Sequence, residues 1–305
     1  MLLRHHDMAP TDFERIAEFV KRFEPRIHPV ILDDRINPGR TIRLISRPSI
    51  IFSPVQVKIF CPLRGRIFQG QWISKSAEYK ALESFGIPIP RWKPLTPDYC
   101  PDLSGFDPYV VVKPDGGARG AEVKLIRRGR VKYKPWKTDL GVQTDDWIIQ
   151  KFIYTGPYPS SYRVATLFGK ALCAHKSELN LDCPQIPRPG HDGVISKFNG
   201  GEMINATRKG RCNINLSFDS EVIDFAERAH SAFPDIPLLG VDVVRDAVTG
   251  KLYVLEVNAS GWVWHLSSSI GKNIQHDFNL NYESQFGWIE KAAHILVEQT
   301  TRYAS

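Results

Sequence analysis

The sequence lacks the segments that would place it in a membrane or export it. No continuous apolar run approaches the roughly eighteen residues of a transmembrane helix, so no membrane partner is expected. Met1–Asp12 contains no apolar core of a secretory signal, and the five cysteines form no C-x-x-C pair. Unpaired thiols and the missing signal together predict a reducing, cytoplasmic location.

Sequence signatures of nucleic-acid binding are also missing. The net charge of +7 would suit nucleic acid, a polyphosphate or an acidic substrate equally well. However, there is no zinc finger, no RNA-binding aromatic motif and no basic helix. Basic residues are spread along the chain, apart from a cluster between Lys124 and Lys137. A nucleic-acid partner is therefore not expected.

The chain of 305 residues is long enough for two or three structural units, and it contains no internal repeat. The first unit is predicted to be a small α/β domain that ends near residue 72, with an amphipathic helix over Thr11–Phe23. Further along, apolar runs predict strands and a second amphipathic stripe predicts another helix. The expected elements are strands at 28–32, 41–45, 49–60, 109–113, 121–126, 147–153, 162–168 and 171–176, a helix after Ser74, and helices at 220–233 and 282–301.

Two lysines and a glycine-rich loop are candidates for binding phosphate groups. Lys75 begins a helix capped by Ser74, where the helix dipole disfavours a cation unless an anion docks there. Lys113 ends an apolar strand and leads into Pro114–Gly120, whose glycines would let backbone N–H groups approach a ligand. The loop is not a Walker A motif, because the Gly-Lys-Ser/Thr step into a helix is missing. The alternatives are solvated lysines and an ordinary hairpin loop.

An acidic hairpin is predicted between residues 239 and 261, where two apolar strands flank a polar turn at Asp246–Gly250. Strict alternation along its second strand places Val254, Glu256 and Asn258 on one face. Carboxylate and amide oxygens on an otherwise apolar sheet suit a hard cation such as Mg²⁺ or Mn²⁺. The alternative is a solvated hairpin whose polar residues point outward.

The register of this hairpin decides whether Asp242 joins the same group. A turn centred on Val248 would put Asp242 opposite Val254, on the face of Glu256 and diagonal to it, at about 7 Å. A slip of one residue would send Asp242 to the other face, so this prediction depends on the turn.

Other polar residues leave two interpretations open. Arg163 and Lys176 lie within predicted strands, where a charged side chain either points to solvent or into a site. The segment 178–210 is rich in Pro, Gly, Asn and Asp and is expected to be a long loop with a functional role. For Trp262, Trp264 and His265, the alternatives are core packing and an aromatic wall of a substrate pocket.

The order of these parts resembles the ATP-grasp superfamily, and most closely its RimK-like and D-alanine–D-alanine ligase branches. The resemblance covers about residues 72–265 and depends most on the pair Gly240-Val-Asp242 and Leu255-Glu-Val-Asn258. It implies an ATP-grasp fold of the α/β and α+β classes, in which two α+β subdomains clasp ATP. The implied domains are an N-terminal α/β domain at 1–72, a central or lid subdomain at 73–150, and a C-terminal subdomain with the metal site at 151–305.

The same resemblance implies a role for each candidate residue. The lysines would contact the ATP phosphates, the glycine loop would form a lid, and a hinge would read adenine mainly through backbone groups. The implied cofactor-binding residues are Lys75, Lys113, Gly116, Gly117, Gly120, Gln150, Lys151, Phe152, Ile153 and Lys176; the catalytic residues are Arg163 and Arg211; and the metal ligands are Asp242, Glu256 and Asn258.

This chain departs from its relatives at three places. The hinge has Gln150 where many relatives carry Glu, and the lid has Arg119 in place of a serine-rich run. Beyond Ser260, the Gly-Trp-Val-Trp-His segment matches no relative. These departures leave the adenine contacts and the acceptor pocket undetermined.

The implied function is an ATP-dependent carboxylate–amine ligase that forms an amide through an acyl phosphate and releases ADP and phosphate. ATP and a pair of Mg²⁺ or Mn²⁺ ions would be required, and the substrates would be a small carboxylate and an amine, such as an amino acid or a peptide. Two alternatives are a phosphotransferase acting on a small acceptor and a nucleotide-binding protein without turnover. The sequence does not identify the substrates or the oligomeric state.

Overall fold

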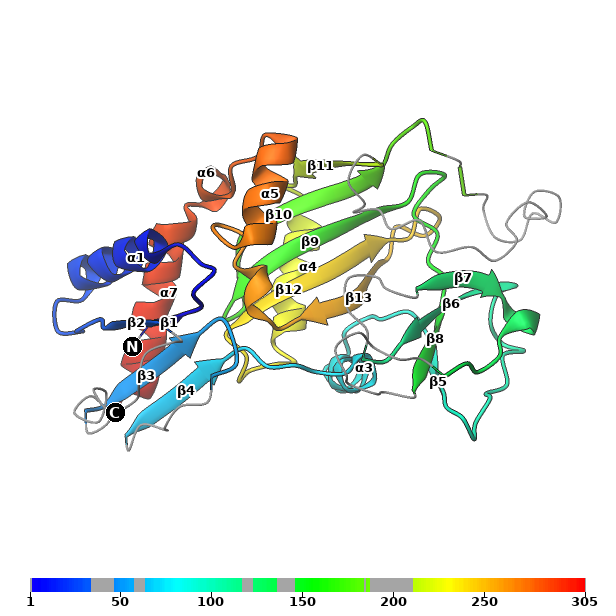
Figure 1. The fold of residues 1–305 in the computed structure, drawn as a ribbon, viewed down its shortest axis with the longest axis horizontal. Coiled ribbons are helices and arrows are strands. Elements are labelled where there is room, and N and C mark those ends of the chain that lie inside the picture. The colour runs from blue at the N-terminus through cyan, green and yellow to red at the C-terminus, as the bar shows by residue number, and fades with distance from the viewer. Residues whose placement is uncertain are drawn as a thin grey trace.

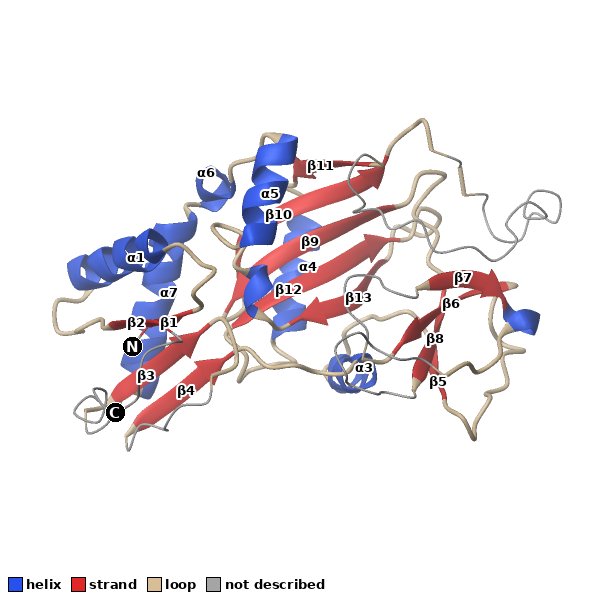
Figure 2. Ribbon diagram, viewed as in Figure 1, coloured by secondary structure: helices blue, strands red, loops and turns tan. Residues whose placement is uncertain are grey.

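Three β-sheets follow one another along the chain in a computed structural model of the protein (Figure 1). Helices lie against the N-terminal and five-stranded sheets, as the colouring by secondary structure shows (Figure 2). Within the described residues, no helix is long and apolar enough to cross a membrane. The structure describes residues 2–33, 47–57, 64–116, 123–135, 146–183, 185–186 and 211–304.

The N-terminal sheet has four parallel strands in the order β2-β1-β3-β4. Helix α1 forms where predicted, because Phe13, Ile16, Ala17 and Val20 give it one continuous buried face. The expected strand at 41–45 lies outside the described residues. The elements are β1 (Leu2–Arg4), α1 (Pro10–Phe23), β2 (Ile31–Asp33), β3 (Ser49–Ser53) and β4 (Gly65–Gln69).

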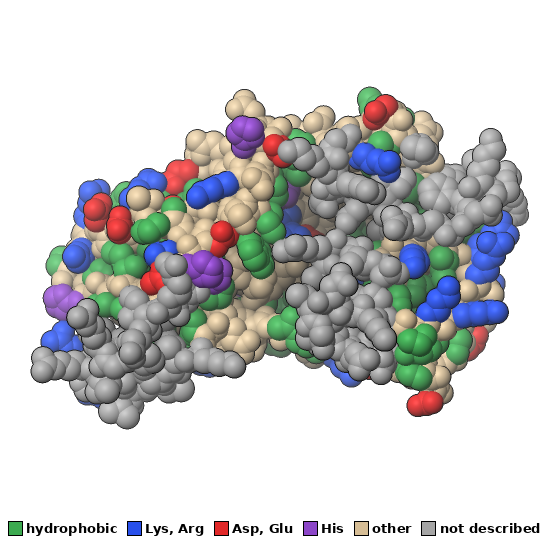
Figure 3. Space-filling model, in the orientation of Figure 1, with side chains coloured by type: hydrophobic (Ala, Val, Ile, Leu, Met, Phe, Trp, Pro, Cys, Tyr) green, Lys and Arg blue, Asp and Glu red, His purple; other side chains and the backbone are tan. Residues whose placement is uncertain are grey.

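The second sheet is small and antiparallel, with the order β5-β8-β6-β7. Helix α3 precedes it and begins at Lys75, because the Ser74 hydroxyl accepts a hydrogen bond from Ala77 N at 3.3 Å. The predicted basic cluster lies partly on β7 and η2, where Arg127, Arg128 and Arg130 are exposed. Lys and Arg side chains gather at this end of the molecule (Figure 3). The elements are α3 (Lys75–Ser84), β5 (Trp92–Leu95), β6 (Tyr109–Pro114), β7 (Lys124–Arg127), η2 (Arg128–Arg130) and β8 (Trp147–Lys151).

The third sheet is antiparallel, with five strands in the order β11-β10-β9-β12-β13. Helix α4 covers one face through an apolar stripe that packs on β9, β10, β12 and β13. The other face lies toward η4, α6 and α7. The elements are β9 (Ser160–Leu167), β10 (Lys170–Leu179), β11 (Cys212–Leu216), α4 (Ser220–His230), β12 (Leu238–Arg245), β13 (Leu252–Asn258), η4 (Gly261–Val263), α5 (Ser269–Phe278), α6 (Tyr282–Phe286) and α7 (Trp288–Tyr303).

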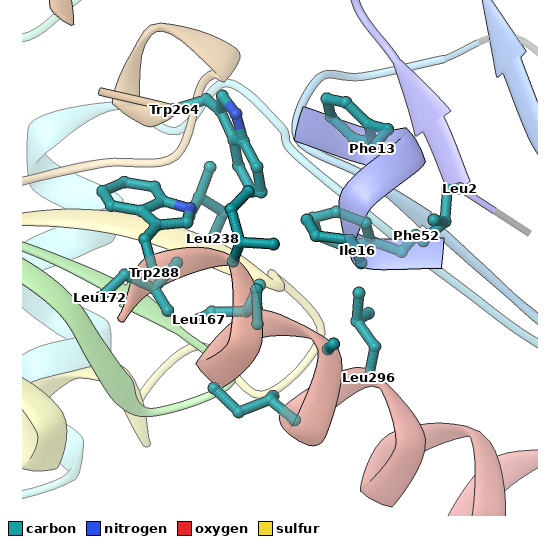
Figure 4. Packing of buried hydrophobic residues seen from close by; sticks show 14 of the residues in the cluster. Leu2, Phe13, Ile16, Phe52, Leu167, Leu172, Leu238, Trp264, Trp288 and Leu296 are labelled. Atoms are coloured by element: carbon teal, nitrogen blue, oxygen red, sulfur yellow. The ribbon is translucent and has the colours of Figure 1, made fainter. Parts of the chain in front are cut away.

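One hydrophobic core joins the first and third sheets through α7 and the segment after β13. Trp264 lies at its centre, stacked on Phe13 with ring centroids 5.1 Å apart and edge-on to Trp288 at 5.4 Å (Figure 4). The single C-terminal helix predicted at 282–301 is instead two helices, because Gly287 adopts a φ of +66° between them. The C-terminal helix therefore attaches the N-terminal sheet to the five-stranded sheet.

Candidate active site

A row of polar side chains crosses the five-stranded sheet on the face opposite α4. Arg163 on β9 pairs in register with His175 on β10 and with Asp242 on β12. Asp242 in turn pairs directly with Glu256 on β13. Residues directly opposite each other on neighbouring strands point to the same face. The register therefore brings one arginine and two carboxylates into line.

The hairpin that carries these carboxylates is not in the predicted register. Asp242 pairs with Glu256, but the next residue along β12 pairs with Val254, so Leu255 has no opposite residue. Val254 and Val257 both pack against α4, a spacing that strict alternation cannot give. Placing Val254 on the face of Glu256, and opposite Asp242, was therefore wrong. The two carboxylates share a face because of this one-residue shift.

Asp242 is held by a cation and an amide. Arg163 Nη2 donates to Asp242 Oδ2 at 2.8 Å, and Arg163 Nε donates to Oδ1. Asn258 Nδ2 also donates to Oδ2, at 3.3 Å. Burial raises the pKa of Asp242, although the neighbouring Arg163 guanidinium opposes this rise. The predicted ligands Asp242, Glu256 and Asn258 thus lie together beside Arg163.

Both predicted phosphate lysines reach the same place from the small-sheet side. Lys75 Nζ lies 3.7 Å from Glu256 Oε1, and Lys113 Nζ donates to the Leu255 carbonyl at 3.3 Å. Burial lowers the pKa of Lys113 to about 8, while the carboxylates of Glu256 and Glu78 act in the opposite direction. Two buried lysines and two carboxylates therefore meet between α3, β6 and β13.

Three further buried residues belong to this cluster and were not predicted. Asp115 accepts hydrogen bonds from Ser76 N at 2.7 Å and from Ser76 Oγ at 2.8 Å, which fixes the start of α3 against the end of β6. Glu78 accepts from Val257 N at 3.3 Å, and burial raises its pKa well above the usual range. The third residue is Tyr79, which is fully buried. Of these three, Glu78 could have been predicted, because it lies one helical turn after Lys75 and so on the same face of α3.

Tyr79 connects β8, which begins the predicted hinge (the hinge strand), to β13, which carries the predicted metal ligands Glu256 and Asn258 (the metal strand). Gln150 Nε2 on β8 donates to Tyr79 Oη at 2.8 Å, and Tyr79 Oη donates to the Leu255 carbonyl at 2.7 Å. The side chain of Gln150 therefore faces α3 and is buried. Lys151 is exposed, with Nζ 3.5 Å from Asp107 Oδ2; in the remainder of the predicted hinge, Phe152 is half-buried and Ile153 is buried.

Several other predicted site residues do not join this cluster. Lys176 occupies the α4 face of β10, the face opposite Arg163, and its Nζ lies 3.4 Å from Glu178 Oε1. Arg211 is exposed at the start of β11, the edge strand farthest from β13. Gly116 lies in the turn after β6, whereas Gly117, Gly120, Arg119 and most of the expected loop at 178–210 lie outside the described residues.

The segment after Asn258 divides between the two interpretations. Trp264 and His265 are buried, which confirms packing for Trp264 in the core. His265 lies beside His175, with ring centroids 5.9 Å apart, and burial lowers the pKa of His175 to about 3. Trp262 is 41% exposed and remains a candidate for a pocket wall.

The donor set can be tested against the requirements of a metal ion. Asp242, Glu256 and the Asn258 amide oxygen are hard oxygen donors, which suit Mg²⁺. Among the described residues, no group of three or more His, Cys, Asp or Glu side chains is placed to hold a metal ion. Mg²⁺ is usually bound by one or two carboxylates together with substrate phosphates. These residues therefore fit an ion that arrives with a nucleotide.

Comparison with known proteins locates this cluster within a described family. The sequence matches the family model for the ATP-grasp domain over residues 73–260. No curated protein matches the sequence. The structure is similar to that of the ATP-grasp ligase PsnB complexed with minimal precursor, Mg and ADP, with a TM-score of 0.56 and 14% identity, covering 98% of this chain and 96% of that one. It is also similar to D-alanine–D-alanine ligase from Bacillus anthracis complexed with ATP, with a TM-score of 0.50 and 13% identity, covering 99% of this chain and 97% of the other. At these identities the likeness establishes the fold.

Proposed function

The chain belongs to the ATP-grasp family, and we propose that it is an ATP-dependent carboxylate–amine ligase. It would form an amide through an acyl phosphate and release ADP and phosphate. The observation that carries this proposal is the meeting of Lys75 and Lys113 with Asp242, Glu256 and Asn258. The cations and oxygen donors of this cluster suit a triphosphate and its metal ions.

The chemistry needs electrostatic positioning more than a covalent protein group. A carboxylate oxygen attacks the γ-phosphorus while the bond to ADP breaks, which gives an acyl phosphate. The amine nitrogen then attacks the carbonyl carbon, and the C–O bond to phosphate breaks. Buried cations placed where negative charge develops lower the activation barrier by about 3–4 kcal/mol per well-placed group.

The lysines, the arginine and the oxygen donors of this cluster each have a place in this scheme. Lys75 and Lys113 bind phosphate oxygens, and Arg163 orients the Asp242 carboxylate. Asp242, Glu256 and Asn258 would hold a pair of Mg²⁺ ions, which neutralise charge on the phosphates when bound. The hinge from Gln150 would receive the adenine ring, through backbone groups, because the Gln150 side chain is already bonded to Tyr79.

The substrate class follows from the same chemistry. A small carboxylic acid and an amine, such as an amino acid or a peptide, are the substrates that this reaction joins. The structure of PsnB complexed with its precursor peptide PsnA2 and AMPPNP, which has a TM-score of 0.53 to this chain, supports including peptides. Lys176, predicted to bind the cofactor, and Arg211, predicted to be catalytic, are not part of this proposal, because Lys176 lies on the α4 face of the sheet and Arg211 precedes its edge strand β11.

The test is a screen of amino acids and small carboxylic acids for substrate-dependent ADP release, with mass spectrometry of the products. An amide product together with ADP supports the ligase. With an ¹⁸O-labelled carboxylate, one label must appear in the released phosphate. A stable phosphorylated product without an amide would instead indicate a phosphotransferase.

A variant that replaces one proposed metal ligand tests the metal site directly. Glu256→Gln should reduce ADP release by at least about 100-fold, because it removes a charged metal ligand while keeping the size of the side chain. Circular dichroism should be unchanged. Full activity of Glu256→Gln with Mg²⁺ would remove Glu256 from the metal site.

A further inference from the structure

The carbonyl of Leu255 lies at the place where the register of the metal strand shifts. Leu255 has no opposite residue on β12, because Asp242 pairs with Glu256 and the next residue pairs with Val254. Its carbonyl accepts two side-chain hydrogen bonds, from Tyr79 Oη at 2.7 Å and from Lys113 Nζ at 3.3 Å. Both donors come from outside the five-stranded sheet. The shift is therefore held by residues of α3 and β6.

The shift decides whether a metal site exists at all. If the pairing of Val254 continued without interruption, Asp242 would lie opposite Leu255. Glu256 would then point toward α4, on the far side of the sheet from Asp242, because successive residues of a strand alternate in direction. The extra residue returns Glu256 to the face of Asp242. Whatever fixes the Leu255 peptide thus fixes the distance between the two carboxylates.

Tyr79 is the better placed of the two donors. Its side chain is fully buried, and its hydroxyl is bonded on both sides, by Gln150 Nε2 at 2.8 Å and by the Leu255 carbonyl. Lys113 makes the longer bond and would be drawn toward phosphate when a nucleotide binds. The tyrosine contact does not compete with a ligand in this way.

We propose that Tyr79 is a positioning residue for the metal site, whose hydroxyl fixes the Leu255 peptide and thereby sets Glu256 beside Asp242. Because Gln150 belongs to the hinge strand, the same hydroxyl links the nucleotide-binding strand β8 to the metal strand β13. This inference rests on the proposed function, since it assumes that the two carboxylates bind a metal ion.

The test replaces only the hydroxyl. Tyr79→Phe keeps the buried ring and removes both hydrogen bonds. Mn²⁺ affinity in the presence of ADP, followed by electron paramagnetic resonance, should fall by about 10-fold to 100-fold, the range found when a group that orients a metal ligand is lost. The readout is binding, so it does not require the unknown acid and amine.

Tyr282→Phe is the matched control. Tyr282 is also fully buried, and its hydroxyl bonds His175 Nδ1 at 2.8 Å, away from β13. Both variants should lower Tm, because each loses a buried tyrosine hydroxyl, and Tyr79→Phe should lower it more because it loses two hydrogen bonds instead of one. Only Tyr79→Phe should lose Mn²⁺ affinity. Equal losses of affinity in the two variants would show a general structural effect and overturn the proposal.

A second measurement follows the peptide itself. The sequence contains two Leu-Glu pairs, at Leu82-Glu83 and Leu255-Glu256. Labelling with [¹³C-carbonyl]leucine and [¹⁵N]glutamate therefore isolates two signals by nuclear magnetic resonance. Tyr79→Phe should strongly shift the signal of the Leu255-Glu256 peptide. The signal of the Leu82-Glu83 peptide should change little, since Leu82 lies near the end of α3. An unchanged Leu255 signal would overturn the proposal.

The outcomes separate this inference from the function on which it rests. If the wild-type protein binds no Mn²⁺ with ADP, or if Glu256→Gln binds it equally well, the metal assignment fails and the inference fails with it. If wild-type binding depends on Glu256 but is unchanged in Tyr79→Phe, only the role of Tyr79 is refuted.

Discussion

The Arg163 guanidinium grips the Asp242 carboxylate from the neighbouring strand, with Nη2 donating to Oδ2 at 2.8 Å and Nε donating to Oδ1. Lys75 stands in a similar relation to Glu256, with Nζ 3.7 Å from Oε1. Each carboxylate proposed to bind a metal ion is therefore next to a cation of the protein. A metal ion can bind only if these contacts are loosened or its charge is shared with phosphates.

Removing Arg163 should reduce activity, whereas removing a similarly exposed arginine on β12 should reduce only stability. Arg163→Met leaves the half-buried Asp242 without its cation, and we expect ADP release to fall by about 100-fold because the carboxylate loses its orientation. Arg245→Met is the control, since Arg245 is similarly exposed on β12 and pairs with Asp219 at 2.8 Å. The control should lose only about 1 kcal/mol in urea unfolding and retain activity. Equal activity losses in both variants would contradict the assignment.

Removing Lys75 should strengthen metal binding only when no nucleotide is present. In Lys75→Gln, Mn²⁺ alone should bind about tenfold more tightly, because no cation competes for Glu256. With ADP present the advantage should disappear, since a phosphate-binding cation is lost. Lys170→Gln, which breaks an ion pair of similar length between an exposed lysine and Glu227, at 3.9 Å, should change neither affinity. Titrations of Mn²⁺ monitored by electron paramagnetic resonance would decide this.

Lys113 should make nucleotide binding sensitive to pH. Its pKa is lowered from 10.5 to about 8 by burial, so the free protein loses this charge as pH rises through about 8. A bound phosphate favours the protonated form, which raises the pKa in the complex. Affinity should therefore be highest below pH 8 and fall by up to about tenfold per pH unit above it. Calorimetry above pH 8 should detect proton uptake on binding, and Lys113→Met should abolish it.

The same shift predicts the pH dependence of folding. The unfolded lysine has the higher pKa, so between about pH 8 and 10.5 the unfolded chain binds more protons than the folded one. The contribution of Lys113 to the free energy of unfolding should therefore rise with pH across this window. Urea unfolding of the wild type and of Lys113→Met, compared at the two ends, would show whether the difference between them narrows.

A methyl group added at Gly240 should destabilise the protein. A Cβ atom there would lie 3.1 Å from Val263 Cγ2 and 3.3 Å from Arg163 Cδ, so Gly240→Ala must displace one of them. We expect a loss of about 1–3 kcal/mol in urea unfolding, and weaker ADP release as Arg163 moves. Gly129→Ala is the control, because nothing lies within 4 Å of its added Cβ. A Gly240→Ala protein with unchanged stability and activity would show that Val263 on η4 and Arg163 can move aside without loss of free energy of unfolding.

Much of the site could be predicted from the sequence because each signal involves only a few neighbouring residues. A capped helix start gave the position of Lys75, an apolar strand ending in a charge gave Lys113, and the polar turn gave the hairpin. These features arise from propensity, capping and alternation over a few residues. The order of the parts then indicated the ATP-grasp family, which the family match over residues 73–260 confirms.

The register of the metal strand was decided only by tertiary structure. Alternation predicted that Val254 and Glu256 share a face, but Val254 and Val257 are both buried against α4, and the intervening peptide is bonded by Tyr79 and Lys113. Those donors lie more than a hundred residues away along the chain. Pairing patterns within a hairpin carry no information about them. The sequence by itself indicated Lys75, Lys113 and the polar residues of the hairpin, but not Glu78, Tyr79 and Asp115 beside them. The packing of α3 and β6 against β13 determined how its carboxylates face one another.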